Sequence, residues 1–139
     1  MFFFTPIHYG AVLGAALSSM VVGFLWYSPL LFGKPWMKLS GLDEKRMNAA
    51  KKNMPITYAA SFLMSLITAY TTAILISSLL VSTLQEGLIL GSIMWLGFIL
   101  TTMGTGVLFQ RVPWKLFFIN SGYQLVSMLI MSTILTLWI

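Results

Sequence analysis

Seven polar side chains lie within two long apolar stretches of the chain, and they are the residues best suited to binding chemistry. Three of them lie beside glycines in one stretch: Thr101, Thr102 and Thr105. The other four follow the spacing i, i+3, i+4 and i+7 in the next stretch, which places them on a single helical face: Asn120, Tyr123, Gln124 and Ser127. Unpaired amides and hydroxyls cost several kcal/mol in hydrocarbon, so these groups should meet one another, water or a ligand.

Two interpretations of these seven residues stay open. Asn120 should lie at a depth similar to that of Thr101 and Thr102, because a helix rises about 1.5 Å per residue. The two sets are therefore expected to share a polar surface. That surface either holds the helices together, with about 0.6–2 kcal/mol per hydrogen bond, or lines a path for a small ion or solute. A path is chemically reasonable because hydroxyls, amides and carbonyls can replace an ion's hydration shell.

The chain offers little for enzymatic chemistry. It contains one histidine, His8, no cysteine, and no acidic residue deep within an apolar stretch. Neither a metal site nor a nucleophile–base pair can be assembled from these residues, so we expect no enzyme activity, no cofactor and no metal. His8 is expected to lie at a membrane surface. Proton-coupled transport usually needs an intramembrane acid or histidine, which argues against a small multidrug antiporter.

The composition predicts that these residues sit in a membrane. The chain is 58% hydrophobic and 8% charged, with a mean hydropathy of +0.90. Too few charges remain to cover the surface of a soluble domain. A span needs roughly 20 apolar residues, and four windows qualify: about 8–27, 55–81, 86–109 and 114–138. Backbone groups in lipid must be bonded internally. We therefore predict an all-α, four-transmembrane-helix bundle that forms a single domain over residues 1–139.

The basic residues predict the orientation of this bundle. All eight fall between predicted spans or at the very start of one: Lys34, Lys38, Lys45, Arg46, Lys51 and Lys52 in the loop 28–54, and Arg111 and Lys115 around the last connection. Because basic loops stay in the cytoplasm, both termini should face outward from an inner or plasma membrane. Interfacial or lipid-binding anchors are expected at the cytoplasmic face: Trp26, Tyr27, Lys34, Trp36 and Trp114. The net charge of +5 is then explained by topology and anionic lipid rather than by nucleic acid.

A short cytoplasmic helix is predicted within the first basic loop. Ser40 and Asp43 fit a capping box, and Lys51 and Lys52 would lie in the last turn of the helix. Breaks in the chain are expected before it, at Gly33, Pro35 and Gly41. This helix is interpreted as a solvated connector resting on the headgroups, or alternatively as a surface for a partner.

Small residues recur at every fourth position and predict where helices approach closely. The second span carries six of them: Thr57, Ser61, Ser65, Ala69, Ala73 and Ser77. The first span carries Gly10, Gly14 and Ser18, and the third begins with Gly87 and Gly91. Small residues allow helices to pack in lipid. The pattern leaves open whether the contact is made within one chain or in a homo-oligomer.

Two stretches are similar to those of a known family. They are Leu25-Trp26-Tyr27-Ser28-Pro29-Leu30-Leu31-Phe32-Gly33-Lys34, which continues through Trp36 and Met37, and Phe118-Ile119-Asn120-Ser121-Gly122-Tyr123-Gln124-Leu125-Val126. They resemble the two hallmark motifs of the family catalogued as domain of unknown function 1761. The resemblance covers essentially the whole chain and implies four spans. It implies no activity, and relatives often carry histidine at the position of Gln124, which puts any proton-linked role there in doubt.

Two functions fit this sequence. The first is an oligomeric channel or facilitator that passes a small ion or solute along the polar faces of the last two spans. Four helices leave little room for a pore, so assembled subunits are expected to form it. The alternative is a non-transporting membrane module that organises lipid or a partner protein through its interfacial anchors and basic loop. A hydrated path past Asn120 and Gln124 would favour the first function. Amides that bond only to each other, together with grooves beside Trp26 and Tyr27 that are open to lipid, would favour the second.

Overall fold

The described part of the chain folds into helices joined by short turns. A computed structural model describes residues 7–40 and 52–138, and these contain no strand. The helices are α1 (Tyr9–Trp26), α2 (Gly33–Ser40), α4 (Met54–Ser78), α5 (Leu84–Met94), the π-helix η2 (Trp95–Leu100), α6 (Thr101–Gln110) and α7 (Trp114–Leu137). Four helical segments are long and apolar enough to cross a membrane: α1, α4, the continuous run 84–110, and α7. The all-helical expectation is confirmed for the described residues.

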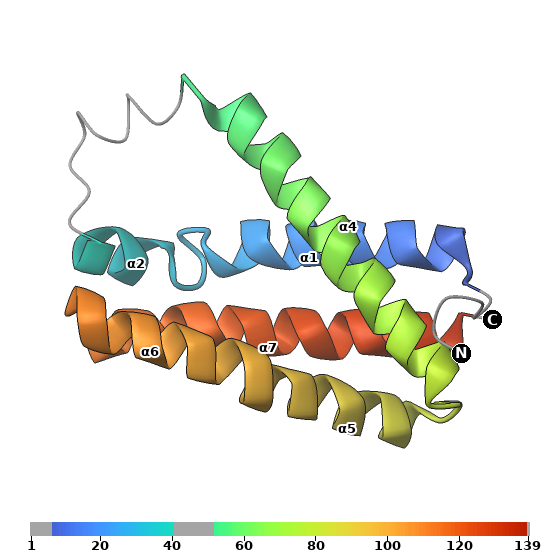
Figure 1. The fold of residues 1–139 in the computed structure, drawn as a ribbon. Coiled ribbons are helices and arrows are strands. Elements are labelled where there is room, and N and C mark those ends of the chain that lie inside the picture. Colours follow the sequence, from blue (N-terminus) through green and yellow to red (C-terminus); the bar gives the residue numbers. More distant parts are fainter. Residues whose placement is uncertain (1–6, 41–51, 139) are drawn as a thin grey trace.

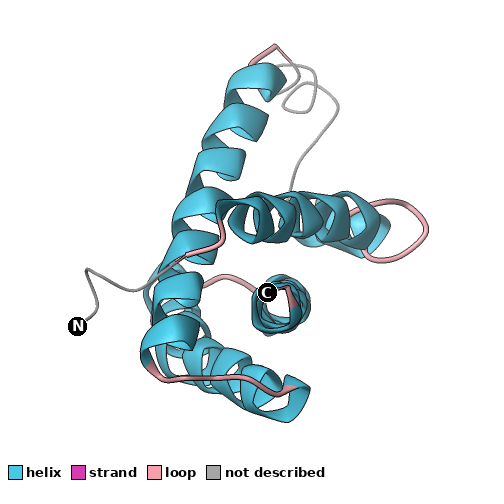
Figure 2. Ribbon diagram, turned by 90° about the vertical axis from the view of Figure 1, so that its right-hand side faces the viewer, coloured by secondary structure: helices cyan, strands magenta, loops and turns pink. Residues whose placement is uncertain are grey.

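The last helix, α7, is the centre of the fold. It contacts α1, α4, α5 and α6, and Figure 2 shows it end-on between the other helices. α1 and α7 run side by side, while α4 crosses both of them obliquely (Figure 1). α1 begins and α7 ends at the same end of the molecule (Figure 1). The polar face of α7 can therefore meet α1 and α4 as well as the third span.

Close approach between α1 and α4 depends on small side chains. Ala11 and Ala15 of α1 and Ala69 and Ala73 of α4 are buried in one apolar core, together with Met128 and Met131 of α7. The buried residues of α4 all lie in its second half, and residues 55–61, with Thr57 and Ser61 among them, are exposed. The predicted stripe on α4 thus packs within the chain from Ser65 onward.

The stripe predicted on α1 has a different role. A Cβ atom on Gly10 would lie 3.0 Å from the ring of His8, and one on Gly14 would lie 3.3 Å from the ring of Trp138. These glycines therefore seat aromatic side chains rather than another helix. The contact of α1 with α4 and α7 is made by a second series, offset by one residue in the sequence and with the same four-residue spacing: Ala11, Ala15, Ser19 and Gly23.

At Gly87 and Gly91, α5 approaches α7 closely. A Cβ atom on Gly87 would lie 2.5 Å from Thr136 Oγ1, and one on Gly91 would lie 2.7 Å from Ser132 Oγ. Both hydroxyls are buried and have no hydrogen-bond partner among the described residues. In each glycine the Cα hydrogen that replaces Cβ points at one of these hydroxyl oxygens. This weak Cα–H···O contact partly offsets the cost of burying the hydroxyl without a hydrogen-bond partner.

Gly91→Ala is expected to lower the free energy of unfolding by about 1–3 kcal/mol, because the added methyl overpacks this contact. Backbone as well as side chain is in the way, since Met128 O would lie 3.3 Å from the new atom. Unfolding in detergent measures the effect. Gly106→Ala is the control: nothing lies within 4 Å of its Cβ position, so alanine should be neutral or stabilise by up to about 1 kcal/mol. Equal losses in both variants would contradict the close contact.

An unpredicted short helix follows the first span. α2 covers Gly33–Ser40, where breaks were expected at Gly33 and Pro35. Pro35 is tolerated because it lies in the first turn, where its missing N–H has no helical partner. Asp43 and Lys51, on which the capping prediction relied, lie outside the described residues.

Candidate functional site

A network of hydroxyls joins three helices near their middle. Ser127 of α7 donates to Ser19 Oγ of α1 at 2.9 Å, and Ser65 of α4 donates to the same oxygen at 3.4 Å. The Tyr123 hydroxyl donates to the Ser19 carbonyl at 3.1 Å and lies 3.3 Å from Ser19 Oγ. Ser19 and Ser127 are buried. Ser19 is therefore the hub through which α1, α4 and α7 are hydrogen-bonded.

A polar cavity of about 260 Å³ adjoins this network. Its walls carry six hydroxyls, one amide and three thioethers: Ser19, Ser61, Ser65, Thr68, Tyr123, Ser127, Gln124, Met64, Met128 and Met131. The Gln124 amide and the Ser61 hydroxyl have no hydrogen-bond partner within the described ranges 7–40 and 52–138. An amide offers two donors and one acceptor, so the cavity presents unused hydrogen-bonding groups of both kinds.

The chemistry of this cavity is polar but uncharged. No lining residue carries a formal charge, and the described residues contain no group of three side chains that could hold a metal ion. Hydroxyls and an amide can bind a neutral solute by hydrogen bonds, whereas transferring a full charge there without a counter-charge is costly. The cavity is suited to a small molecule that both donates and accepts hydrogen bonds.

Two sequence motifs, one at the end of the first span and one in the last helix, pack directly against each other. The Tyr27 hydroxyl donates to Asn120 Oδ1 at 2.6 Å, and the Trp26 indole N–H donates to the Ile119 carbonyl at 2.9 Å. A Cβ atom on Gly122 would lie 3.1 Å from the Trp26 ring. Gly122 is needed because the indole of Trp26 lies across the helix at that position.

Tyr27, the residue that follows α1, was predicted to be an interfacial anchor, but its hydroxyl belongs to this helix contact. Burial and, to a smaller extent, the neighbouring Tyr123 raise the pKa of Tyr27 to about 12. The hydroxyl therefore keeps its proton and remains a donor to Asn120. Among the other predicted anchors, Lys34 and Trp114 are exposed, and the half-buried Trp36 ring lies 5.5 Å from that of Tyr27.

The structure does not bring the three threonines to the polar face of α7. Thr101, Thr102 and Thr105 are exposed. Each hydroxyl donates to a carbonyl of its own helical run, at Gly97, Phe98 and Thr101 respectively, over 2.6–3.0 Å. Two of these carbonyls lie in the π-helix η2, so the hydroxyls serve the backbone where the helix changes its pitch. The polar surface expected between the last two spans is instead formed by α7 with α1 and α4.

Four of the polar residues that line the cavity were not singled out as site residues from the sequence: Ser19, Ser61, Ser65 and Thr68. Ser61 and Ser65 did belong to the predicted stripe of small residues on α4, where they were interpreted as packing positions. Ser19 belongs to the four-residue series with Ala11, Ala15 and Gly23, which is visible in the sequence. That series is the signal that would have located the polar centre of α1.

Ser19→Ala is expected to lower the free energy of unfolding by about 1–3 kcal/mol. The variant removes the shared oxygen and leaves the hydroxyl of Ser127 buried without its acceptor, and each such bond contributes about 0.6–2 kcal/mol. Thermal unfolding in detergent measures the loss. Ser18→Ala is the control, because Ser18 only donates to the Ala15 carbonyl of its own helix. A hub role would be excluded if both variants unfolded at the wild-type temperature.

Comparison with known proteins identifies a family but assigns no role to this arrangement. The family model described as protein of unknown function (DUF1761) matches residues 10–136, which include both motifs and all but the outermost residues of the four membrane-length helices. No curated protein and no solved structure matches the chain significantly.

Proposed function

The chain belongs to the DUF1761 family of proteins of unknown function, and for this member we propose a role as a membrane facilitator for a small uncharged polar solute. The solute binds in the cavity between α1, α4 and α7. Gln124 and Ser61 supply the unused hydrogen-bonding groups, and the network around Ser19 holds the three helices in register. This path replaces the one predicted along the last two spans.

The Gln124 amide is the observation that carries this proposal. Gln124 lies near the middle of α7, the helix Trp114–Leu137, and in a membrane this position is close to the centre of the hydrocarbon. A polar group there without a partner costs several kcal/mol. Water or a solute in the adjoining cavity removes that cost, which explains why a polar cavity persists beside it.

Access to the cavity is proposed from the end where α4 begins. Residues 55–61 at the start of α4 are exposed, whereas its second half is closed off against α1 and α7 by Ala69, Ala73, Met128 and Met131. Passage therefore requires this apolar seal to open, by a displacement of α4 relative to α7. The conformation with this apolar seal closed is one state of an alternating-access or gated transport cycle.

We place the chain in the inner or plasma membrane with its basic end in the cytoplasm. The described basic residues lie in α2, just before α4, just after α6, or in the first turn of α7: Lys34, Lys38, Lys52, Arg111 and Lys115. These segments lie at the end opposite to the start of α1 (Figure 1). Under the positive-inside rule the cavity then opens toward the cytoplasm.

Flux into proteoliposomes tests this function. Purified protein should raise the permeability to glycerol or urea above that of protein-free liposomes, while K⁺, Na⁺, H⁺ and halide should permeate no faster than without protein. Light scattering follows the neutral solutes and ion-sensitive dyes follow the ions. Faster ion flux would replace the uncharged-solute proposal with a channel, and no flux of any solute would overturn transport altogether.

The alternative, a module that organises lipid through Trp26 and Tyr27, receives less support. The polar groups of both side chains are engaged by α7, so they are not free to bind headgroups. Homo-oligomerisation remains part of the proposal. The continuous run 84–110 buries the smallest share of the four membrane-length segments, and this exposed side is the surface on which a second copy would pack.

A further inference from the structure

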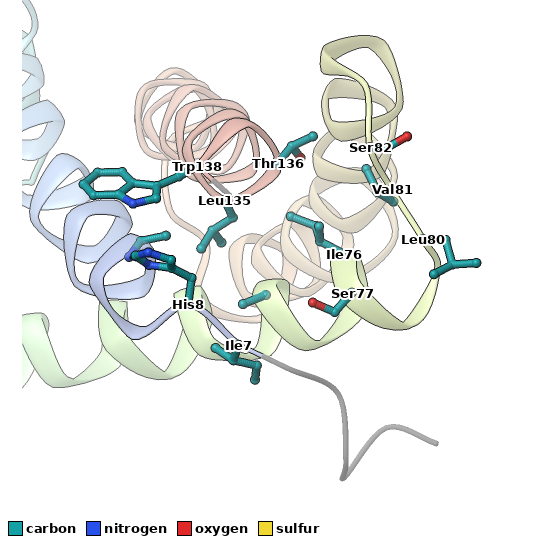
Figure 3. A pocket seen from close by; sticks show the side chains of 12 residues that line it. Ile7, His8, Ile76, Ser77, Leu80, Val81, Ser82, Leu135, Thr136 and Trp138 are labelled. Carbon is teal, nitrogen blue, oxygen red and sulfur yellow. The ribbon is translucent and has the colours of Figure 1, made fainter.

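A groove of about 710 Å³ lies at the end of the molecule where α1 begins and α7 ends. Figure 3 shows it between three elements: Ile7 and His8 before α1, the end of α4, and the last turn of α7. Its walls are mainly apolar, with Ile76, Val81 and Leu135 among them. The groove is separate from the polar cavity at mid-span, with which it shares no lining residue.

Two aromatic N–H groups lie at this groove. The ring of His8 caps α1: its Nδ1 accepts a hydrogen bond from the Ala11 N–H at 3.0 Å. Because Nδ1 accepts, the proton of the neutral ring is on Nε2, which is therefore a donor. The ring of Trp138 lies 5.7 Å from that of His8 and carries a second donor, Nε1. Neither donor has a hydrogen-bond partner in the part of the chain that the structure describes.

The walls of the groove are held in place by local structure. The rings of His8 and Trp138 rest on Gly10 and Gly14, where a larger residue would displace them. On the opposite wall, the Leu80 N–H donates to the Ser77 carbonyl and the Val81 N–H to the Ile76 carbonyl. Leu80 has a positive φ of 58°, so these bonds form the Schellman turn that ends α4. The groove is thus a preformed feature rather than a gap between loose segments.

We propose that this groove binds a membrane phospholipid of the leaflet at that end, with an acyl chain along its apolar wall. A phosphate or ester oxygen of the same lipid accepts hydrogen bonds from His8 Nε2 and Trp138 Nε1. Three features match such a ligand: apolar walls, two unused donors at one end, and the positive end of the α1 dipole beside them. No acidic residue lines the groove to oppose a phosphate.

Cross-linking with a phospholipid that carries a photoreactive acyl chain tests the proposal in the full-length protein. Labelling mapped by mass spectrometry should concentrate on segments 76–82 and 135–138, rather than on the exposed outer side of α5. A diacylglycerol with the same chains should label these segments less, because it lacks the phosphate. The double variant His8→Asn/Trp138→Phe should reduce phospholipid labelling roughly tenfold, since each bond to a charged acceptor contributes more than a neutral one.

The substitutions in this test are chosen to keep the fold. Asparagine is a good N-cap, so His8→Asn keeps the acceptor for the Ala11 N–H while removing the Nε2 donor. Phenylalanine keeps an aromatic ring on Gly14. Trp114→Phe, at the other end of α7, is the control and should not change the labelling. Labelling that is unchanged in the double variant would overturn the proposal. So would labelling that appears only after residues 2–5 are deleted, because the occupant would then be the chain's own N-terminal segment.

Discussion

Gln124→Leu should reduce the solute permeability of proteoliposomes by about tenfold or more. The variant replaces the only amide of the cavity by a side chain of similar size that can neither donate nor accept. A solute that loses one or two hydrogen bonds to a desolvated partner is bound more weakly by about 1–3 kcal/mol, and about 1.4 kcal/mol corresponds to a factor of ten. Stopped-flow light scattering with glycerol or urea measures the change.

The controls for Gln124→Leu separate the cavity from the path that the sequence predicts. Thr102→Val should leave permeability unchanged, because the hydroxyl of Thr102 bonds only to Phe98 of its own helical run and is exposed. Unfolding and gel filtration of both variants confirm that folding is intact. If Thr102→Val abolished flux and Gln124→Leu did not, the conducting surface would lie on the third span, and the cavity between α1, α4 and α7 would be structural only.

Gly33→Ala should lower the free energy of unfolding by roughly 3 kcal/mol or more. The added Cβ would lie 2.5 Å from the Tyr27 carbonyl oxygen and 2.7 Å from the carbonyl group of Ser28. These are backbone atoms, so no side-chain rotation relieves the overlap. The turn is also fixed by hydrogen bonds from the Phe32 N–H to the Trp26 carbonyl and from the Gly33 N–H to the Ser28 carbonyl, both at 2.9 Å.

Opening of this turn should release the contact between the two motifs. Trp26 and Tyr27 would shift from Ile119 and Asn120, and the Trp fluorescence spectrum in detergent should change together with the unfolding temperature. Gly104→Ala is the matched control, since its Cβ would meet only the ring of Phe117 at 3.9 Å. Wild-type stability of Gly33→Ala would contradict a close approach of Gly33 to the backbone of Tyr27 and Ser28.

Hydropathy was sufficient to predict the four membrane-length helices, because a lipid environment allows only internally bonded backbone. The bounds of the described membrane-length helices differ from the predicted ones by at most two residues, except at the end of the second span, where the Schellman turn at Leu80 ends α4 at Ser78, three residues early. The helix α2 was missed because glycine and proline were interpreted as breaks. Both residues lie in its first turn, where neither disrupts a helical hydrogen bond.

The rotation of each helix about its axis was harder to predict. In a membrane both the lipid and the protein interior are apolar, so hydrophobicity does not indicate which face is buried. The polar spacing of Asn120, Tyr123, Gln124 and Ser127 did identify the polar face of α7. The partners of that face did not follow, because depth alone made Thr101 and Thr102 as suitable as Ser19. Only packing of small residues on α1 and α4 decides between them.

Cysteine accessibility at the cavity tests the central claim most directly, and the cysteine-free chain allows single-cysteine variants without further change. Ser61 lines the cavity, whereas Leu63, two residues further along α4, is exposed outside it. A membrane-impermeant methanethiosulfonate reagent reacts only with thiolates that water reaches. We predict that Ser61→Cys reacts from the side of the basic loops, that glycerol or urea slows this reaction, and that Leu63→Cys does not react. Equal reactivity of the two positions, or none at Ser61→Cys from either side, would contradict a solute cavity between α1, α4 and α7.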